Sequence, residues 1–218
     1  IITWRLSMFA AKIGTDIAGL LDLGNGVHGV SIDNSKFVNI GDGTNPNRNV
    51  ISGNTEDGVQ VSNAASNVTV DNNLIGLDAT GLTVLPNGND GIDMTGANQN
   101  IISNNYISGN GQHGIYVQSA ATTTNTIQSN FIGLLTDGAD GGNGGDGINL
   151  DACQQNTIGG TLGNGNIIGW NTGDGISLNG NGTDDNIIGD NLIGVDAVNA
   201  LIPNGANGIY IASTATSN

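Results

Sequence analysis

Basic side chains and glutamate are scarce in this 218-residue sequence: Lys and Arg together number four, and Glu56 is its single glutamate. With 19 acidic residues, the formal net charge is −15. A surface this acidic repels nucleic acids and anionic membranes, so neither is expected as a partner. Lys, Arg and Glu are strong helix formers, so their scarcity also argues against a helical fold.

Cysteine and long apolar runs are also lacking. Cys153 is the single cysteine, so an internal disulfide is excluded. It has no nearby histidine in its repeat, and we expect a small turn or core residue there rather than a nucleophile. No apolar run approaches the roughly 18–20 residues that a transmembrane helix needs, so membrane insertion is not expected. The first eleven residues lack the basic segment and apolar core of a signal peptide.

Glycine, in contrast, is abundant, with 37 residues, and Asn, Asp, Thr and Ile are frequent as well. Gly, Asn and Asp favour turns, whereas Ile and Thr favour strands. Hydrophobic residues make up 37% of the chain and occur in short, regular clusters. This regularity separates the sequence from Gly-rich disordered segments.

An internal repeat predicts the fold. The motif Gly-aliphatic-x-aliphatic begins at seven glycines: Gly29, Gly58, Gly91, Gly114, Gly147, Gly175 and Gly208. The gaps between them are 29, 33, 23, 33, 28 and 33 residues, and the shortest fits one coil of three short strands. The pattern predicts an all-β, single-domain, right-handed three-sheet parallel β-helix of about seven rungs, in which stacking buries continuous aliphatic columns.

Longer loops recur in every second rung, after the third strand. They span residues 14–29, 76–91, 133–147 and 194–208, and each ends in Asn-Gly-x-x-Gly. The two-rung super-repeat is therefore 62, 56 and 61 residues long. Asp16, Asp78 and Asp196 stand two residues after the first glycine of their loops, whereas the third loop has Leu135 at that position.

Asparagines are expected to form two ladders along the solenoid, because stacked amides bond to the rungs above and below. One column lies at the entrance to the third strand: Asn49, Asn73, Asn105, Asn130, Asn166 and Asn191. A second lies at the entrance to the second strand: Asn67, Asn100, Asn125, Asn156 and Asn186, with Val38 as the exception.

Both ends of a solenoid expose strand edges that need a cover. Residues 1–11, with Trp4, Met8 and Phe9, are predicted to form an N-terminal cap, and residues 12–218 to form the β-helix. The sequence stops after the first strand of a new rung. We therefore expect the solenoid to continue in a longer protein or to pair with another chain.

Several strings resemble the parallel β-helix repeats of large bacterial and archaeal cell-surface proteins, and more widely the pectate-lyase-like superfamily. They are Asn-Val-Ile-Ser-Gly-Asn at 49–54, Asn-Leu-Ile-Gly-Leu-Asp-Ala-Thr-Gly at 73–81 and Asn-Leu-Ile-Gly-Val-Asp-Ala at 191–197. The resemblance implies this fold and an extracellular or cell-surface location. The group mixes adhesins, structural proteins, lyases and hydrolases, so the resemblance assigns no catalytic residue here.

Enzymes of that superfamily usually bind sugar on the outer face of the first sheet. Aligned rungs predict two outward columns there: Ser31, Gln60, Asp93, Tyr116, Asn149, Ser177 and Tyr210, then Asp33, Ser62, Thr95, Gln118, Asp151, Asn179 and Ala212. The predicted substrate-binding residues are Tyr116, Gln118, Asn149 and Tyr210. If the chain is an enzyme, Asp93, Asp151 and His113 are the predicted catalytic residues. Asp93 and Asp151 lie two rungs and about 10 Å apart, near the spacing of inverting glycosidases.

A third column precedes the first strand: His28, Asp57, Asp90, His113, Asp146, Asp174 and Asn207. Neighbouring carboxylates about 5 Å apart repel each other unless one is protonated or a cation lies between them. Asp57, Asp90, Asp146 and Asp174 are therefore candidate calcium ligands, and no other cofactor is expected. The alternative is an Asp-Gly turn in which each carboxylate caps backbone.

Two functions follow. The regular rungs favour a structural or adhesive module of an extracellular or surface protein, whose partners are a polysaccharide or neighbouring copies of itself. The alternative is a polysaccharide-degrading enzyme. A glycoside hydrolase is favoured over a lyase, because none of the four basic residues falls on the predicted sugar face.

Overall fold

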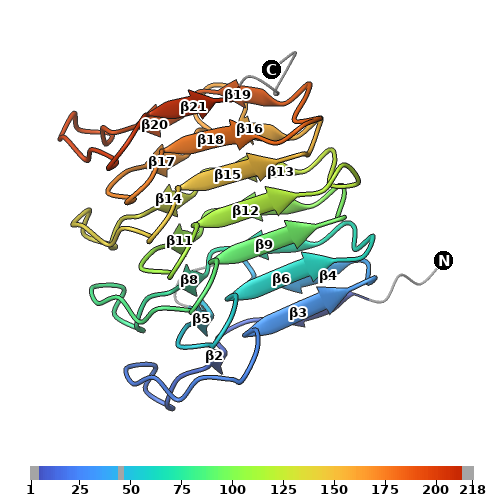
Figure 1. The fold of residues 1–218 in the computed structure, drawn as a ribbon. Helices are drawn as coiled ribbons and strands as arrows, with labels where there is room; N and C mark the ends of the chain where they lie inside the picture. The colour runs from blue at the N-terminus through green and yellow to red at the C-terminus, as the bar shows by residue number, and fades with distance from the viewer. Residues whose placement is uncertain (1–4, 44–46, 213–218) are drawn as a thin grey trace.

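The computed structural model describes residues 5–43 and 47–212, and these residues form three parallel sheets of seven strands each (Figure 1). Sheet one contains β3 (Val30–Asp33), β6 (Val59–Ser62), β9 (Ile92–Thr95), β12 (Ile115–Gln118), β15 (Ile148–Asp151), β18 (Ile176–Asn179) and β21 (Ile209–Ile211). Sheet two contains β1 (Leu6–Met8), β4 (Val38–Ile40), β7 (Thr69–Asp71), β10 (Ile101–Ser103), β13 (Thr126–Gln128), β16 (Thr157–Gly159) and β19 (Ile187–Gly189). Sheet three contains β2 (Lys12–Ile13), β5 (Val50–Ile51), β8 (Leu74–Ile75), β11 (Tyr106–Ile107), β14 (Phe131–Ile132), β17 (Ile167–Ile168) and β20 (Leu192–Ile193). The predicted right-handed parallel β-helix is confirmed.

Close packing between rungs explains the glycine at the start of every repeat except the last. A Cβ atom on Gly114 would lie 2.6 Å from the carbonyl oxygen of Gly147 and 2.7 Å from Cγ2 of Ile132. Gly91 is equally confined, because its Cβ would meet the carbonyl oxygen of Gly114 at 2.6 Å. These glycines are therefore needed for the approach of the next rung.

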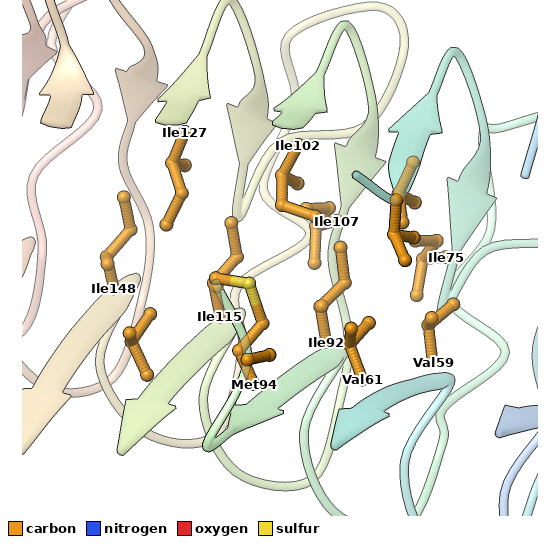
Figure 2. Close-up of a cluster of buried hydrophobic side chains, with 14 of the residues drawn as sticks. Val59, Val61, Ile75, Ile92, Met94, Ile102, Ile107, Ile115, Ile127 and Ile148 are labelled. Carbon is orange, nitrogen blue, oxygen red and sulfur yellow. The ribbon is translucent and has the colours of Figure 1, made fainter. Parts of the chain in front are cut away.

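Each rung contributes aliphatic side chains from all three sheets to one continuous core (Figure 2). Sheet one supplies two per strand, such as Ile115 and Val117, while sheets two and three supply Ile102 and Ile107. All four are fully buried. Cys153 belongs to the same core, as expected, and burial raises the pKa of its thiol to about 12. The thiol is therefore un-ionised at neutral pH and a poor nucleophile.

Asparagine ladders connect the rungs. At the entrance to sheet three, the amide Nδ2 of Asn73 donates to Oδ1 of Asn105 at 2.9 Å, and Asn105 donates to Asn130 at 3.0 Å. This ladder is confirmed from Asn49 to Asn191. The ladder before sheet two is confirmed for Asn100, Asn125, Asn156 and Asn186, but its predicted first member is wrong.

The position opposite Asn100 is Val68, whose N–H donates to Asn100 Oδ1 at 2.9 Å. Asn67 lies one residue earlier, exposed, with a φ of 54°. It occupies the left-handed turn that Asn tolerates well, so its residue type reflects the bend rather than the ladder.

The cap predicted for residues 1–11 overlaps the first strands of the solenoid. β1 pairs with β4, and Leu6 and Phe9 are largely exposed at this end. Residues 1–4, including Trp4, lie outside the described residues, so the cap stays a prediction. Within residues 5–43 and 47–212, no helix is long and apolar enough to cross a bilayer.

Candidate functional site

The outer face of sheet one carries the predicted polar columns in register. Ser31, Gln60, Asp93, Tyr116, Asn149, Ser177 and Tyr210 pair in sequence from strand to strand. The second column runs in the same way from Asp33 through Ser62, Thr95, Gln118 and Asp151 to Asn179. Because the strands stack about 4.8 Å apart, the face is a flat polar grid.

At the centre of this face, on β9, β12 and β15, diagonal hydrogen bonds connect the two columns. Gln118 Nε2 donates to Asp93 Oδ1 at 3.2 Å, and the Tyr116 hydroxyl donates to Asp151 Oδ2 at 3.1 Å. Asp93 and Asn149 are each only 7% exposed, so neighbouring side chains hold them firmly. The predicted sugar contacts Tyr116, Gln118 and Asn149 thus form one preorganised cluster with both predicted catalytic carboxylates.

Tyr210 lies apart from that cluster. It is three strands further along the same column, on β21, and is 45% exposed. It stays a predicted contact only for a ligand that runs along the solenoid axis.

The column beside this face is held by the backbone. Asp57 Oδ1 accepts from the N–H of Asp90 at 3.1 Å, and Asp90 Oδ1 accepts from the N–H of His113 at 2.8 Å. His113 Nδ1 in turn accepts from the N–H of Asp146 at 3.0 Å. The pattern continues when Asp146 accepts from the N–H of Asp174 at 2.7 Å. Each side chain therefore caps the next rung, and His113 carries its neutral-state proton on Nε2.

These contacts bear on the predicted calcium site. Among the described residues, no group of three or more His, Cys, Asp or Glu side chains is arranged to hold a metal ion. In both predicted pairs the carboxylates use an oxygen on a backbone N–H, as the turn alternative requires. Calcium at Asp57, Asp90, Asp146 and Asp174 stays a prediction with fewer free ligand atoms than the sequence suggests.

Burial shifts the ionisation of this region. It raises the pKa of Asp90 to about 7, with a further upward contribution from the Asp57 and Asp93 carboxylates. Burial also raises the pKa values of Asp57 and Asp93 and lowers that of His113. Burial, followed by the charge of Asp151, raises the pKa of Tyr116 to about 12. Near neutral pH, the centre of the face therefore carries less charge than its carboxylate count indicates.

The proposed catalytic pair is more widely spaced than rung counting predicts. Asp93 aligns with Tyr116 and Asn149, whereas Asp151 aligns with Gln118, so the two acids are offset by two residues as well as two strands. These offsets put their Cα atoms about 12 Å apart. Inverting glycosidases hold their carboxyl groups about 6.5–9.5 Å apart. The side chains would have to lean toward each other, yet Gln118 and Tyr116 already bond to them.

His113 packs beside Tyr116 and Asp146. Its ring centroid is 5.4 Å from that of Tyr116, and its Nδ1 is 3.5 Å from Asp146 Oδ2. His28 is three strands away in the same column, as predicted, so the two histidines are separate. His113 can therefore contact a ligand over Tyr116 through Nε2, while Nδ1 is used by the backbone.

Sequence reasoning missed a third asparagine ladder beside this face. Its members stand four residues before each repeat glycine: Asn25, Asn54, Asn87, Asn110, Asn143, Asn171 and Asn204. Four of them had been recognised as loop ends, but the shared spacing to glycine identifies all seven. Sequence reasoning also missed a pocket on sheet three, lined by Lys12 and Arg48.

The fold and register define the chain as a right-handed parallel β-helix. No protein-family model and no curated protein matches its sequence. Two similar solved structures are A-modules of Azotobacter vinelandii mannuronan C-5 epimerases. For AlgE4 the TM-score is 0.57 at 14% identity, covering 98% of this chain and 58% of the other. For AlgE6 the TM-score is 0.52 at 17% identity, covering 86% of this chain and 55% of the other. The chain thus spans little more than half of each module, and at these identities the likeness shows the fold alone.

Proposed function

We propose that the chain is a structural or adhesive module of an extracellular or cell-surface protein and contacts a polysaccharide through the outer face of sheet one. The carrying observation is the unbroken polar grid on that face, with Tyr116, Gln118 and Asn149 at its centre. A flat surface of amides, hydroxyls and a phenol ring suits sugars, which present both hydroxyls and apolar C–H faces.

Two further observations support a glycan over a protein partner. The grid repeats at the strand spacing along the solenoid, so a linear polymer can make equivalent contacts on successive rungs. In addition, both similar structures are modules of enzymes named for a polysaccharide, mannuronan.

A matched pair of glutamines tests this proposal. Gln118 and Gln128 are both half-buried strand residues, but Gln118 belongs to sheet one and Gln128 to sheet two. In affinity electrophoresis through gels containing different polysaccharides, Gln118→Ala should lose retention by the gel that slows the native protein. Gln128→Ala should keep it. Equal behaviour of both variants, or no retention by any polysaccharide, would remove the proposed surface.

Neighbouring copies of the chain are the second proposed partner. The outermost strands of the described solenoid expose apolar side chains, with Ile187 62% and Ile211 57% exposed. Light scattering over a hundredfold concentration range tests this directly. A constant monomer mass would exclude self-assembly.

Catalysis is the second candidate function, and one observation favours it. Burial raises the pKa of Asp93, so this carboxyl group keeps its proton to a higher pH than an exposed aspartate does, as a general acid requires. A glycoside hydrolase would then use Asp93 and Asp151, with His113 nearby. Release of reducing ends from a polysaccharide panel tests it, and activity that survives Asp93→Asn would exclude this site.

A further inference from the structure

The long loops of alternate rungs contact one another across the shorter rungs between them. The N–H of Ala79 donates to the carbonyl of Gly19 at 2.8 Å, which joins loop 76–91 to loop 14–29. The N–H of Thr136 donates to Gly81 at 3.0 Å, which joins loop 133–147 to loop 76–91. Figure 1 shows these loops projecting from one edge of the solenoid, beside sheet three. They form a wall along that sheet.

Between this wall and the sheet lies a pocket of about 490 Å³. Its floor is the outward column of sheet three, where Lys12, Val50, Leu74 and Tyr106 pair in succession. Thr80 and other wall residues line the opposite side. The volume falls in the range of about 300–1,000 Å³ that is usual for small-molecule sites.

The charge of this pocket is opposite to that of the chain. Lys12 and Arg48 are two of only four basic residues in a protein with 19 acidic ones, and both line the pocket. The other lining residues are apolar or carry neutral hydroxyls, so none is acidic. Within the described part of the chain, neither cation forms an ion pair with a carboxylate. An anion can therefore reach both cations without displacing a carboxylate.

Arg48 is held ready for such a ligand. Its Nε donates to Asn72 Oδ1 at 2.9 Å, and its Cζ lies 5.1 Å from the centre of the Tyr106 ring, within cation–π range. Tyr106 is itself fixed by stacking on Phe131, with ring centroids 4.5 Å apart and planes 5° apart. Among the described residues, only its Nε has a hydrogen-bond partner, so the two terminal nitrogens of the guanidinium can form the fork that matches a carboxylate.

We propose that this pocket binds a small organic carboxylate whose anionic group meets Arg48 and Lys12. A sugar acid is the best fit, because hydroxyl groups of Thr80 and Thr136 and apolar groups of Val50 and Leu74 surround the two cations. The ligand is small, since the net charge of −15 repels an extended polyanion outside the pocket. This site lies on sheet three and is independent of the polysaccharide surface proposed on sheet one.

Three probes separate the parts of the proposal: glucuronate, glucose and inorganic sulfate. Amide and arginine Nε shifts in ¹⁵N NMR spectra follow the titration of each into the full chain. Glucuronate should shift the Arg48 Nε and Tyr106 amide signals, whereas glucose should not. If sulfate binds as tightly as glucuronate, the pocket holds oxyanions without regard to the ring, and the organic carboxylate is refuted.

Variants test the two cations. Arg48→Gln and Lys12→Gln should each weaken glucuronate binding at least tenfold, as expected for a lost charge-assisted hydrogen bond. Lys36→Gln makes the same charge change outside the pocket and should leave the affinity within twofold. Because Lys12 is exposed, its replacement tests the site even if Arg48→Gln unfolds. Binding that is absent, or that Lys12→Gln and Lys36→Gln weaken equally, would overturn the proposal.

The same titrations distinguish this site from the surface on sheet one. Gln118→Ala should leave glucuronate binding in the pocket unchanged, while it abolishes retention by polysaccharide gels. Loss of glucuronate binding in Gln118→Ala would place the carboxylate site on sheet one and refute the pocket.

Discussion

Asn105 is the residue whose replacement tests the ladder mechanism most directly. Its fully buried side chain donates to the Val70 carbonyl at 2.8 Å and to Asn130 Oδ1 at 3.0 Å. Its Oδ1 accepts from the backbone N–H and the side-chain amide of Asn73, both at 2.9 Å. Asn105→Ala therefore removes four hydrogen bonds and leaves at least the Asn73 N–H buried without its partner.

An unsatisfied buried polar group costs about 1–3 kcal/mol. With the Val70 carbonyl as a second affected group, we expect Asn105→Ala to lower the free energy of unfolding by about 2–6 kcal/mol. In a chain of this size, that corresponds to a fall in melting temperature of roughly 4–24 °C. Asn89→Ala is the matched control, since its side chain accepts an exposed bond from Gln112 and should cost less than about 0.5 kcal/mol.

Urea unfolding followed by circular dichroism gives both free energies, and thermal melts give an independent ranking. If Asn105→Ala and Asn89→Ala differ by less than about 0.5 kcal/mol, buried amide ladders do not hold the rungs together, and aliphatic stacking alone carries the fold. Retained far-ultraviolet spectra at low temperature are needed in both variants, so that loss of stability is compared between folded proteins.

Three further predictions concern the same framework. The folded pKa of Asp90 is about 7 against 3.8 in the unfolded chain, so its ionisation should lower the free energy of unfolding as pH rises from 4 to 7; Asp90→Asn should flatten this dependence in urea titrations. Gly114→Ala should cost more than about 2 kcal/mol through overpacking, whereas Gly208→Ala, with its nearest atom 3.7 Å from the new Cβ, should be tolerated in thermal melts. Cys153 should resist a thiol reagent at pH 8 until the chain is unfolded.

The fold was predictable because rung stacking leaves its mark on the sequence at fixed positions. Gly114 has no room for a Cβ, and Asn105 bonds to neighbours on both sides, so the residue type at each position is dictated by the next rung. Alignment of repeat glycines then recovers the register of sheet one. It fails at Asn67, because an asparagine in a left-handed turn looks the same in sequence as one in a ladder.

The candidate site was less predictable, for two physical reasons. Alignment of the repeats assigns residues to each column correctly. A distance between two columns also depends on the offset along the strand, and this offset increases the separation of Asp93 and Asp151. The pocket on sheet three depends on contacts between loops two rungs apart, such as Gly19 with Ala79. Variable loops carry no repeat signal for those contacts, so Lys12 and Arg48 are unremarkable in the sequence.

The alternation of long and short rungs explains how one architecture provides chemically different recesses. Loops spaced by two rungs leave an opening over sheet three in each super-repeat. In the first it contains Lys12 and Arg48, and in the next a recess of about 150 Å³ is lined by Phe131, Leu135 and Val198. Leu135 stands where the other long loops have aspartate. An aspartate at this position bonds to the backbone of its own loop, as Asp196 does by accepting from two backbone N–H groups. Leu135 thus adds an apolar side chain to a recess that Asp196 also lines. The two recesses therefore differ in the side chains that line them, while the repeat maintains the backbone geometry around both.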